Sequence, residues 1–381
     1  MPTDLDVAQR EFADSVRAFG RKHLKEGALT RAHDAGYSWD TAQLLAGQGL
    51  LGLTVPESDG GQGATLLDAV IAIQELGRIC PKSADIVQAG NFGALRTFAE
   101  YGSTDQKAQY LPALLAGRSL LALAMSEPEA GSAVTDLKTY ARHDGDGYVI
   151  NGTKSWSTHS VDADLFLVYV RFAPGVGGIG SVLIERGTPG FTSGKASTYM
   201  SGEQWAPLYF DDCRIPEGNV LLGVGGFKRQ ISGFNFERIG NAARSLALGR
   251  LAFDLARDHV LQREQFGHPL AEFQGLQWKF AEVAVALDAA QLLLYRAARN
   301  ADQGLPSVYE TSVAKLAANE AGFRAANEAM QAMGAMGYST ESLVEYCMRR
   351  TRGWMIAGGS VEILKNRIAE EVFGRHFNQR G

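Results

Sequence analysis

The chain has 381 residues, of which 45% are hydrophobic, so it can bury a large core and divide into two or three structural units. Lys and Arg total 37 and Asp and Glu total 42, a net charge of −5 without a long run of either sign. This balance argues against nucleic acid or an anionic membrane surface as a partner. The 3 cysteines lack metal-ligand spacing, and neither a targeting signal nor an apolar run of ~18 residues is visible. We therefore expect a cytoplasmic globular protein with reduced thiols and no metal ion.

Helical patterns dominate the first third of the chain. Apolar residues recur at helical spacing from Leu5 to Phe19, and Thr65-Leu-Leu-Asp68 has the pattern of a capping box that begins a second helix. The Gly-rich segment 49–63 between them is predicted to be a loop. We assign residues 1–118 to an N-terminal α-helical domain.

Residues 119–226 carry the pattern of β-strands separated by Gly and Pro, and are assigned to a middle β domain. The strands that follow its first segment are expected at 148–150, 153–156, 165–172, 181–185 and 208–210. Asn151-Gly152 is predicted to be a hairpin turn between the first two of these strands.

Gly175-Val-Gly-Gly-Ile-Gly180 satisfies the dinucleotide-binding pattern G-x-G-x-x-G. A strand rather than a helix is expected after it, so a helix N-terminus that would hold a pyrophosphate is missing. We therefore predict a hairpin loop there.

Residues 227–381 return to long helical patterns and are assigned to a C-terminal α-helical bundle. Two predicted helices have apolar stripes, which contain Leu276, Phe280, Val283, Leu287 and Leu294 in one helix, and Val313, Leu316, Phe323 and Met330 in the other. Many Ala residues accompany these stripes and favour close helix packing.

The segment Leu121–Thr139 changes character in the middle. A strand-like run ends at Ser126, and Glu127-Pro128 prevents a continuing helix. Ala130-Gly131-Ser132 then offers small residues and free backbone N–H groups, which suit the close approach of a flat ligand with polar edges. An ordinary polar turn between two strands is the alternative reading of this segment.

Three further segments have both a structural and a ligand-binding interpretation. Trp156-Ser157-Thr158 ends a predicted strand, where an indole can stack in the core or on a ligand and a hydroxyl can donate a hydrogen bond. Arg263-Glu-Gln-Phe-Gly267, with Phe273-Gln274 after it, supplies a guanidinium that is either solvated or bound to a pyrophosphate. Gln331-Ala-Met-Gly-Ala-Met-Gly-Tyr338 is the third segment.

In order and spacing, these segments resemble the acyl-CoA dehydrogenase family over nearly the whole chain, from Leu5 to Ile368. The first resembles the family's Thr/Ser-Glu-Pro-x-Ala-Gly-Ser, and the others its Trp-Ile-Thr, Arg-x-Gln-Phe-Gly and Gln-x-x-Gly-Gly-x-Gly-Tyr. Ser157, His159 and Ala335 depart from the usual Ile, Asn and Gly. The resemblance implies an α+β fold with an N-terminal helical domain, a central β-barrel-like domain and a C-terminal four-helix bundle.

The resemblance also implies bound FAD, with part of its site completed by a neighbouring subunit. The implied cofactor-binding residues are Leu123, Met125, Ser126, Gly131, Ser132, Trp156, Ser157, Thr158, Arg263, Gln265, Phe266, Gln274, Gln331, Gly334, Ala335, Ser360 and Glu362. The implied substrate-binding residues are Ser132, Asn235, Arg238, Gly358 and Gly359.

The catalytic base of this chain must differ from that of many relatives. Their Glu in Ile-Tyr-Glu-Gly-Thr-x-Glu-Ile corresponds to Gly358 in Ile356-Ala-Gly-Gly-Ser-Val-Glu-Ile363. Isovaleryl-CoA dehydrogenase-like members carry the base in Leu-Asp-Leu-Glu-Arg, which Phe234-Asn-Phe-Glu-Arg238 matches. Glu237 is therefore the candidate base, although Glu beside Arg on a helix is more often a surface pair.

The resemblance implies flavin-dependent desaturation of an acyl thioester, with proton abstraction and hydride transfer to N5 of FAD. The substrate is expected to be an acyl-CoA or an acyl carrier protein, including those of secondary metabolism, and the electron acceptor an electron-transfer flavoprotein or oxygen. A homotetramer is expected. The alternatives are an enoyl-thioester reductase or γ,δ-desaturase of the same family, and a catalytically silent flavin-binding homologue.

Overall fold

The computed structural model describes residues 5–301 and 306–377. It contains two compact units. The first, called here the helical unit, comprises Met1–His33, Thr65–Gln88 and Asn235–Gly381. The second, called the sheet unit, comprises Asp34–Ala64 and Ala89–Phe234.

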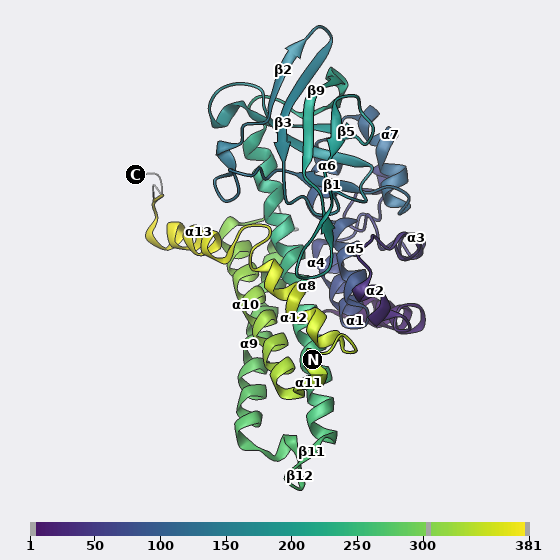
Figure 1. Cartoon of the computed structure of the whole chain (residues 1–381), viewed down its shortest axis with the longest axis vertical. Coiled ribbons are helices and arrows are strands. Elements are labelled where there is room, and N and C mark those ends of the chain that lie inside the picture. The colour runs from purple at the N-terminus through teal and green to yellow at the C-terminus, as the bar shows by residue number, and fades with distance from the viewer. Residues whose placement is uncertain (1–4, 302–305, 378–381) are drawn as a thin grey trace. The chain divides into compact units, whose positions relative to one another are not determined.

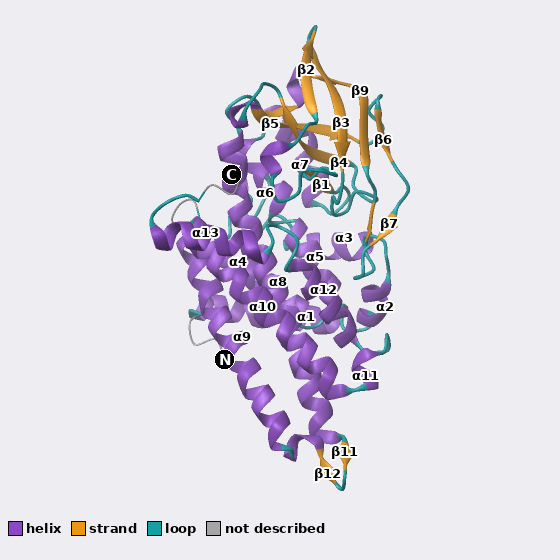
Figure 2. Ribbon diagram, turned by 60° about the vertical axis from the view of Figure 1, so that its left-hand side comes forward, coloured by secondary structure: helices purple, strands orange, loops and turns teal. Residues whose placement is uncertain are grey.

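The sheet unit is built on one eight-stranded sheet, drawn in orange in Figure 2. Its strand order is β10-β5-β4-β2-β3-β9-β6, and β1 pairs in parallel with β4. The strands are β1 (Leu121–Ala124), β2 (Tyr140–Asp144), β3 (Gly147–Lys154), β4 (Leu165–Arg171), β5 (Ile179–Glu185), β6 (Phe191–Ser193), β9 (Leu208–Pro216) and β10 (Val220–Leu222). A separate pair is formed by β7 (Ser197–Thr198) and β8 (Gln204–Trp205).

The central strands of this sheet, β4 and β5, are buried on both faces. Alternate residues of β4 enter different cores, with Leu165 and Leu167 on one side and Phe166 and Val168 on the other. The first core also contains apolar residues of α6 (Gly93–Tyr101) and α7 (Thr104–Leu115). The sheet unit further contains α3 (Trp39–Ala46) and the 3-10 turn η1 (Glu57–Asp59), which lies in the predicted Gly-rich loop.

The predicted hairpin turn at Asn151-Gly152 is wrong, because β3 runs through these residues. The register of β3 against β9 shifts between Ile150 and Gly152, as expected for a β-bulge. Gly152 has φ 145°, and an added Cβ would lie 2.5 Å from Oγ1 of Thr139. The glycine therefore serves a bulge and a close contact, and β2 instead turns into β3 around Gly145, which has φ 67°.

The segment 175–180 connects β4 to β5 through a short 3-10 turn, η3 (Val176–Gly178). The strand β5 follows directly. The prediction of a hairpin loop in place of a dinucleotide-binding turn is confirmed.

The helical unit contains the long helices of the chain, of which α9 and α10 run side by side (Figure 1). Its helices are α1 (Val7–His23), α2 (Ala28–His33), α4 (Leu66–Gly77), α5 (Pro81–Ala89), α8 (Phe227–Gln262), α9 (Gln274–Ala301), α10 (Val308–Met333), α11 (Ala335–Tyr338), α12 (Leu343–Trp354) and α13 (Val361–Phe373). The first turns of α8, up to Phe234, and the last residue of α5 belong to the sheet unit. Thr65 caps α4 with the predicted reciprocal bonds to Asp68. A hairpin of β11 (Glu264–Gln265) and β12 (His268–Pro269) and the turn η5 (Leu270–Glu272) join α8 to α9.

The predicted apolar stripe of α10 is wrong by one residue along the helix. The large side chains of Val313, Leu316 and Phe323 are half-buried, whereas the fully buried face carries small residues such as Ala314 and Ala318. Size explains the difference, because only small side chains let the backbones approach closely.

The helices α8 and α10 approach each other closely at a pair of glycines. A Cβ on Gly249 would lie 2.7 Å from Cα of Gly322, and one on Gly322 would lie 2.4 Å from the carbonyl oxygen of Ser245. The two helices therefore touch through their backbones at this point.

We predict that Gly322→Ala destabilises the protein by about 1–3 kcal/mol, because the added methyl group overpacks a backbone contact. Gly353→Ala in α12 is the matched control, since its added Cβ meets no atom within 4 Å. Ala is the better helix former, so the control is expected to be neutral or stabilising by up to about 1 kcal/mol. Denaturant unfolding of both variants measures the difference, and equal stabilities would contradict the close approach.

Candidate active site

A buried ion pair shapes the segment between β1 and β2. Oε1 of Glu127 accepts from Nζ of Lys154 at 2.8 Å and from the backbone N–H of Thr139 at 2.9 Å. Its Oε2 accepts from the backbone N–H of Lys138 at 2.6 Å, and Lys154 also donates to the carbonyl of Met125 at 3.1 Å. Glu127 thus holds both ends of the 125–139 segment. Sequence reasoning treated this residue only as a helix breaker.

Burial governs the protonation of this ion pair. The Lys154 side chain has no exposed surface, and burial lowers its pKa to about 8 against the raising influence of Glu127. Burial by itself raises the pKa of Glu127, but the charge of Lys154 and the hydrogen bonds bring that pKa below its ordinary value. Both groups are therefore charged at neutral pH.

The structure brings two of the predicted flavin segments together in the sheet unit. The backbone N–H of Ser155 donates to the carbonyl of Ser126 at 2.9 Å, which joins the end of β3 to the end of β1. Trp156 follows with φ 62° and an indole that is 56% exposed, its ring centroid 4.1 Å from that of Trp205. A positive φ in an aromatic residue is strained, which is common at binding sites.

These residues fit a flat heteroaromatic ring with polar edges. Gly131 and Ser132 are exposed, and an added Cβ on Gly131 would meet no atom within 4 Å. Thr158 is exposed, and the buried Oγ of Ser157 has no hydrogen-bond partner among the described residues. Leu123, Met125 and Ser126 are half-buried beside them in sequence. The open backbone, the indole and the hydroxyls suit the flavin of FAD.

Glu237 lies in α8 of the helical unit, with its side chain 16% exposed. Nε2 of Gln88 donates to its Oε2, and Nη2 of Arg244 lies 3.5 Å from its Oε1. Burial raises the pKa of Glu237, while Arg244 and Lys315 oppose that rise. A carboxyl group with a raised pKa is suited to exchanging a proton near neutral pH.

Gly358 faces Glu237 within the same unit. A Cβ on Gly358 would lie 3.9 Å from Cγ of Glu237, 3.6 Å from Cε of Lys315 and 3.8 Å from Nδ2 of Asn241. Gly358 and Gly359 have φ 68° and 90°, conformations that favour glycine. The side chain that residue 358 lacks would therefore point to the place where Glu237 stands.

A buried lysine holds the Gly358-Gly359 loop. Nζ of Lys315 donates to the carbonyl of Trp354 at 3.1 Å and to that of Gly359 at 2.9 Å. Nδ2 of Asn319 donates to the same Trp354 carbonyl at 2.7 Å. Burial lowers the pKa of Lys315 to about 7. The sequence offered only one sign of this role, a Lys inside an Ala-rich helical stripe.

The two remaining substrate candidates of α8 are buried and bonded within the unit. Nη1 of Arg238 donates to Oδ1 of Asn235 at 3.0 Å and to Oγ of Ser312 at 3.2 Å, and Asn235 donates to the carbonyl of Pro306 at 3.3 Å. Burial lowers the pKa of Arg238 to about 10. A substrate contact for these two residues stays a prediction.

The remaining cofactor candidates lie on the surface of the helical unit. Phe266, at the tip of the β11–β12 hairpin, is 91% exposed with φ 56°. Ser360 caps α13, with its Oγ accepting from the N–H of Ile363 at 3.4 Å. The other exposed candidates are Arg263, Gln265, Gln274, Gln331, Gly334, Ala335 and Glu362.

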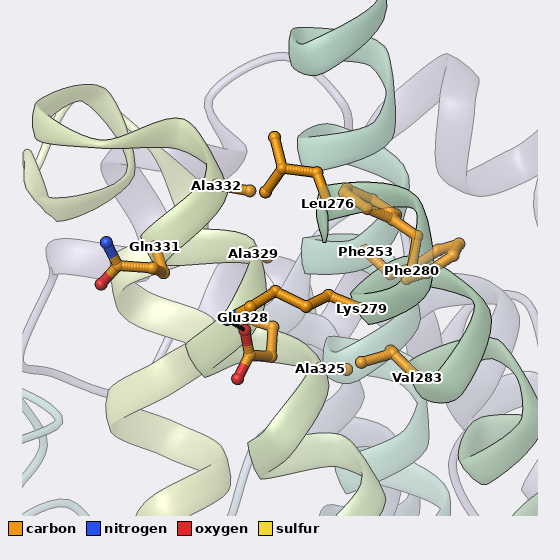
Figure 3. A pocket seen from close by; sticks show the side chains of 10 residues that line it. All are labelled: Phe253, Leu276, Lys279, Phe280, Val283, Ala325, Glu328, Ala329, Gln331 and Ala332. Atoms are coloured by element: carbon orange, nitrogen blue, oxygen red, sulfur yellow. Dashed lines mark hydrogen bonds and ion pairs between the residues drawn. The ribbon is translucent and has the colours of Figure 1, made fainter. Parts of the chain in front are cut away.

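An apolar pocket of about 320 Å³, including its open side, lies between α8, α9 and α10 (Figure 3). Phe253, Leu276 and Phe280 line it, and Lys279 pairs with Glu328 at 2.6 Å beside it. Figure 3 shows the amide of Gln331 pointing away from the aromatic rings. The pocket therefore places an apolar hollow next to one of the predicted flavin residues.

Comparisons with known proteins identify the family. The N-terminal, middle and C-terminal domain models of the acyl-CoA dehydrogenases match residues 6–118, 122–213 and 225–373. The chain belongs to the acyl-CoA dehydrogenase family. It has the fold of that family, and like its members it is an FAD-dependent oxidoreductase that acts on CH–CH groups.

Members of the acyl-CoA dehydrogenase family with different activities match the chain over nearly their full length. It is 34% identical to a 3-sulfinopropanoyl-CoA desulfinase of Paraburkholderia xenovorans, covering 99% of both chains. It is 37% identical to an acryloyl-CoA reductase (NADH) of Anaerotignum propionicum, covering 98% of this chain and 97% of that one. The structure of butyryl-CoA dehydrogenase from Megasphaera elsdenii matches with TM-score 0.91 and 30% identity over 98% and 100% of the two chains.

We predict that Lys154→Met destabilises the protein by about 3–5 kcal/mol, because it leaves the buried carboxylate of Glu127 without its cation. It should also weaken FAD retention, since the 125–139 segment loses its anchor. Lys138→Met is the control, because the Lys138 side chain is 77% exposed and forms its ion pair with the equally exposed Glu129. Thermal unfolding and the ratio of flavin to protein after gel filtration measure both effects. A Lys154 variant that matches the control would refute the anchoring role.

Proposed function

We propose that the protein desaturates an acyl thioester, with Glu237 as the base that takes the α-proton. The observation that carries the proposal is the distance of 3.9 Å between Cγ of Glu237 and the position of a Cβ on Gly358. A carboxylate from α8 thus lies beside the position where the family resemblance implies a carboxylate on residue 358. The raised pKa of Glu237 suits a general base near neutral pH.

Two sets of residues support the reaction in this proposal. The sheet-unit residues Ser126, Ser132, Trp156 and Thr158 hold the ring of FAD, which when bound supplies the hydride acceptor. The backbone N–H groups of the 358–360 loop polarise the thioester carbonyl, and Lys315 fixes that loop through its bond to Gly359. Glu237 then needs only to accept a proton from the acidified carbon.

The acyl group and the direction of the reaction are open to three candidates that the relatives support. The first candidate is desaturation of a short acyl-CoA, and the second is reduction of an enoyl thioester. The third is a reaction whose substrate is a short acyl-CoA with an anionic group at the end of its acyl chain. Carrier-protein thioesters present the same phosphopantetheine arm and belong in the same test. We further propose an electron-transfer flavoprotein or oxygen as acceptor.

The domain boundaries at 118 and 226 and a cytoplasmic location remain part of this proposal. The matched ranges of the three family models support the boundaries. Cys80, Cys213 and Cys347 are buried and unpaired, which is consistent with a reducing compartment. Among the described residues there is no helix long and apolar enough to span a membrane.

We also propose that the protein is a homotetramer whose subunits share the flavin sites. On α9 the exposed apolar side chains of Trp278, Val285 and Leu292 are spaced by seven residues and are 60%, 70% and 56% exposed. Residues at this spacing lie on one helix face, and such a stripe is typical of a helix packed against a partner. The exposed Arg263 and Phe266 hairpin provides residues to complete a neighbour's site.

We predict that Glu237→Gln slows anaerobic reduction of bound FAD by the best thioester at least ~100-fold, because the amide cannot accept the proton. The thioester panel is butyryl-CoA, succinyl-CoA, 3-sulfinopropanoyl-CoA and their carrier-protein counterparts. Substrate should still perturb the flavin absorption of the variant, since size and hydrogen bonding are kept. Stopped-flow absorbance measures both, and Gly358→Glu added to Glu237→Gln tests whether a carboxylate on residue 358 restores part of the rate.

A Glu237→Gln rate near that of the wild type would show that the proton leaves by another route. The alternative of a catalytically silent homologue would be favoured by two results together. The bound FAD would be reduced by no thioester, and after chemical reduction it would be reoxidised by no enoyl thioester.

We predict that the FAD-saturated protein sediments as an oligomer, heavier than the 41.0 kDa chain. Val285→Glu should yield smaller species with less bound FAD, because it places a charge in the apolar stripe of α9. Val176→Glu is the control, since Val176 is also an exposed apolar residue, at 50%, but lies in the β4–β5 loop. An active, FAD-saturated monomer would contradict the shared-site proposal.

A further inference from the structure

The carboxylate of Glu237 belongs to a chain of alternating buried charges that no motif of the sequence indicated. Nη2 of Arg350 lies 2.6 Å from Oδ2 of Asp85, and Nη1 of Arg244 lies 2.9 Å from Oδ1 of Asp85. Arg244 then reaches Glu237 at 3.5 Å. The order is cation, anion, cation, anion, contributed by α12, α5 and α8. The side chains of Arg350, Asp85 and Arg244 are 12%, 9% and 8% exposed.

The indole of Trp354 fixes both arginines of this chain. The guanidinium carbons of Arg244 and Arg350 each lie 4.9 Å from the centroid of its ring. Cation–π contacts of this kind are strongest when the cation is desolvated. Arg244 is thus held by an ion pair and an aromatic face, and its remaining Nη2 points to Glu237.

The groups that act most strongly on the pKa of Glu237 oppose one another. Arg244 on α8 and Lys315 on α10 lower its pKa by their charge, and Gln88 on α5 lowers it by a hydrogen bond. Asp85 on α5 raises it. Arg350 compensates part of the negative charge of Asp85, so Asp85 weakens the attraction between Arg244 and Glu237 less. Burial is the largest influence and acts in the direction of Asp85.

We propose that Arg244 is a positioning residue for Glu237, which it holds beside Gly358 in the ionised form that accepts a proton. Asp85, Arg350 and Trp354 keep Arg244 in place, and Gln88 fixes the second carboxylate oxygen. The inference rests on the proposed role of Glu237 as the base. It adds a second requirement, that the ionisation of the base depends on an arginine seven residues further along the same helix.

The test is the pH profile of anaerobic FAD reduction by the best thioester of the panel. In Arg244→Met the charge opposing burial is removed, so the pKa of Glu237 rises and the acidic limb of the profile moves to higher pH by about 1. At pH values below the wild-type limb the rate should fall about tenfold, and well above both limbs it should be unchanged, because one unit of pKa changes the ionised fraction tenfold only on the acidic side. Arg244→Lys retains a positive charge and is expected to recover part of the shift.

Asp85→Asn is expected to shift the acidic limb of the pH profile in the opposite direction, so it keeps the proposal testable if Arg244→Met folds poorly. It removes an anion that raises the pKa of Glu237, while the amide oxygen of Asn can still accept the hydrogen bond of Arg244, so the acidic limb should move to lower pH. General damage to the fold has no reason to produce shifts of opposite sign in the two variants. Arg349→Gln is the matched control, because Arg349 neighbours Arg350 in α12 but pairs with Glu345 at 2.6 Å.

A double-mutant comparison separates a role through Glu237 from any other role. In the Glu237→Gln background, Arg244→Met should change the reduction rate by less than about twofold, since groups that act as a unit are non-additive. Two results would overturn the inference. One is a pH profile that is unshifted in both Arg244→Met and Asp85→Asn, and the other is an effect of Arg244→Met on the reduction rate that is as large in the Glu237→Gln background as in the wild type. If Glu237→Gln itself reduces FAD at the wild-type rate, the proposed function fails instead.

Discussion

The candidate site depends on one constraint, that the carboxylate of Glu237 is largely buried within a helical bundle. Taking an ion out of water costs several kcal/mol even after relaxation, so an isolated Glu at this position would be neutral. The alternation of Arg350, Asp85, Arg244 and Glu237 offsets that cost with near neighbours of opposite charge. Burial still prevails, because the pKa of Glu237 stays above its ordinary value.

This arrangement needs helices that approach closely. The contact of Gly249 with Gly322 brings the backbones of α8 and α10 together. Ala314 and Ala318 on the buried face of α10 leave room for Lys315 to extend to the carbonyls of Trp354 and Gly359. A stripe of large residues in the same place would have held the helices apart. The small residues of α10 are thus a condition for the geometry of the 358–359 loop.

The order and spacing of the motifs were enough to predict the fold, because the family segments span the chain. The spacing of apolar residues also changes from a helical to a strand period where helices give way to strands. Local chemistry was misleading at Asn151-Gly152. Those residues have the composition of a hairpin turn, but a bulge over Thr139 also requires a glycine, and only the pairing of β3 with β9 distinguishes the two. The buried face of α10 was also predicted wrongly, because in a tightly packed helix pair the most buried positions are occupied by small residues rather than by large apolar ones.

The sequence suggested Glu237 and Gly358 as candidates, but it did not indicate the groups that surround them. Asp85, Arg244 and Arg350 are far apart in the sequence. Nothing in the sequence around each of them distinguishes it from an ordinary charged residue on the surface. Their burial and mutual distances exist only in the folded unit. Glu127 and Lys154 escaped notice in the same way. Ion pairs between distant segments carry no periodicity, so patterns along a sequence cannot reveal them.

Moving the base from residue 358 to α8 changes what determines its proton affinity. A carboxylate on residue 358 would lie on a loop that contains two glycines with positive φ and is held by Lys315. Glu237 instead stands on a long helix, where its backbone is fixed and its environment is set by side chains of α5, α8 and α10. Substitutions of side chains on α5 and α8 can retune Glu237 without altering the loop that is proposed to contact the thioester, whereas Lys315 on α10 acts on both Glu237 and that loop. Relatives of this fold carry out dehydrogenation, reduction and desulfination, so a base whose tuning is separate from thioester binding is one physical route by which a common scaffold accommodates different chemistry.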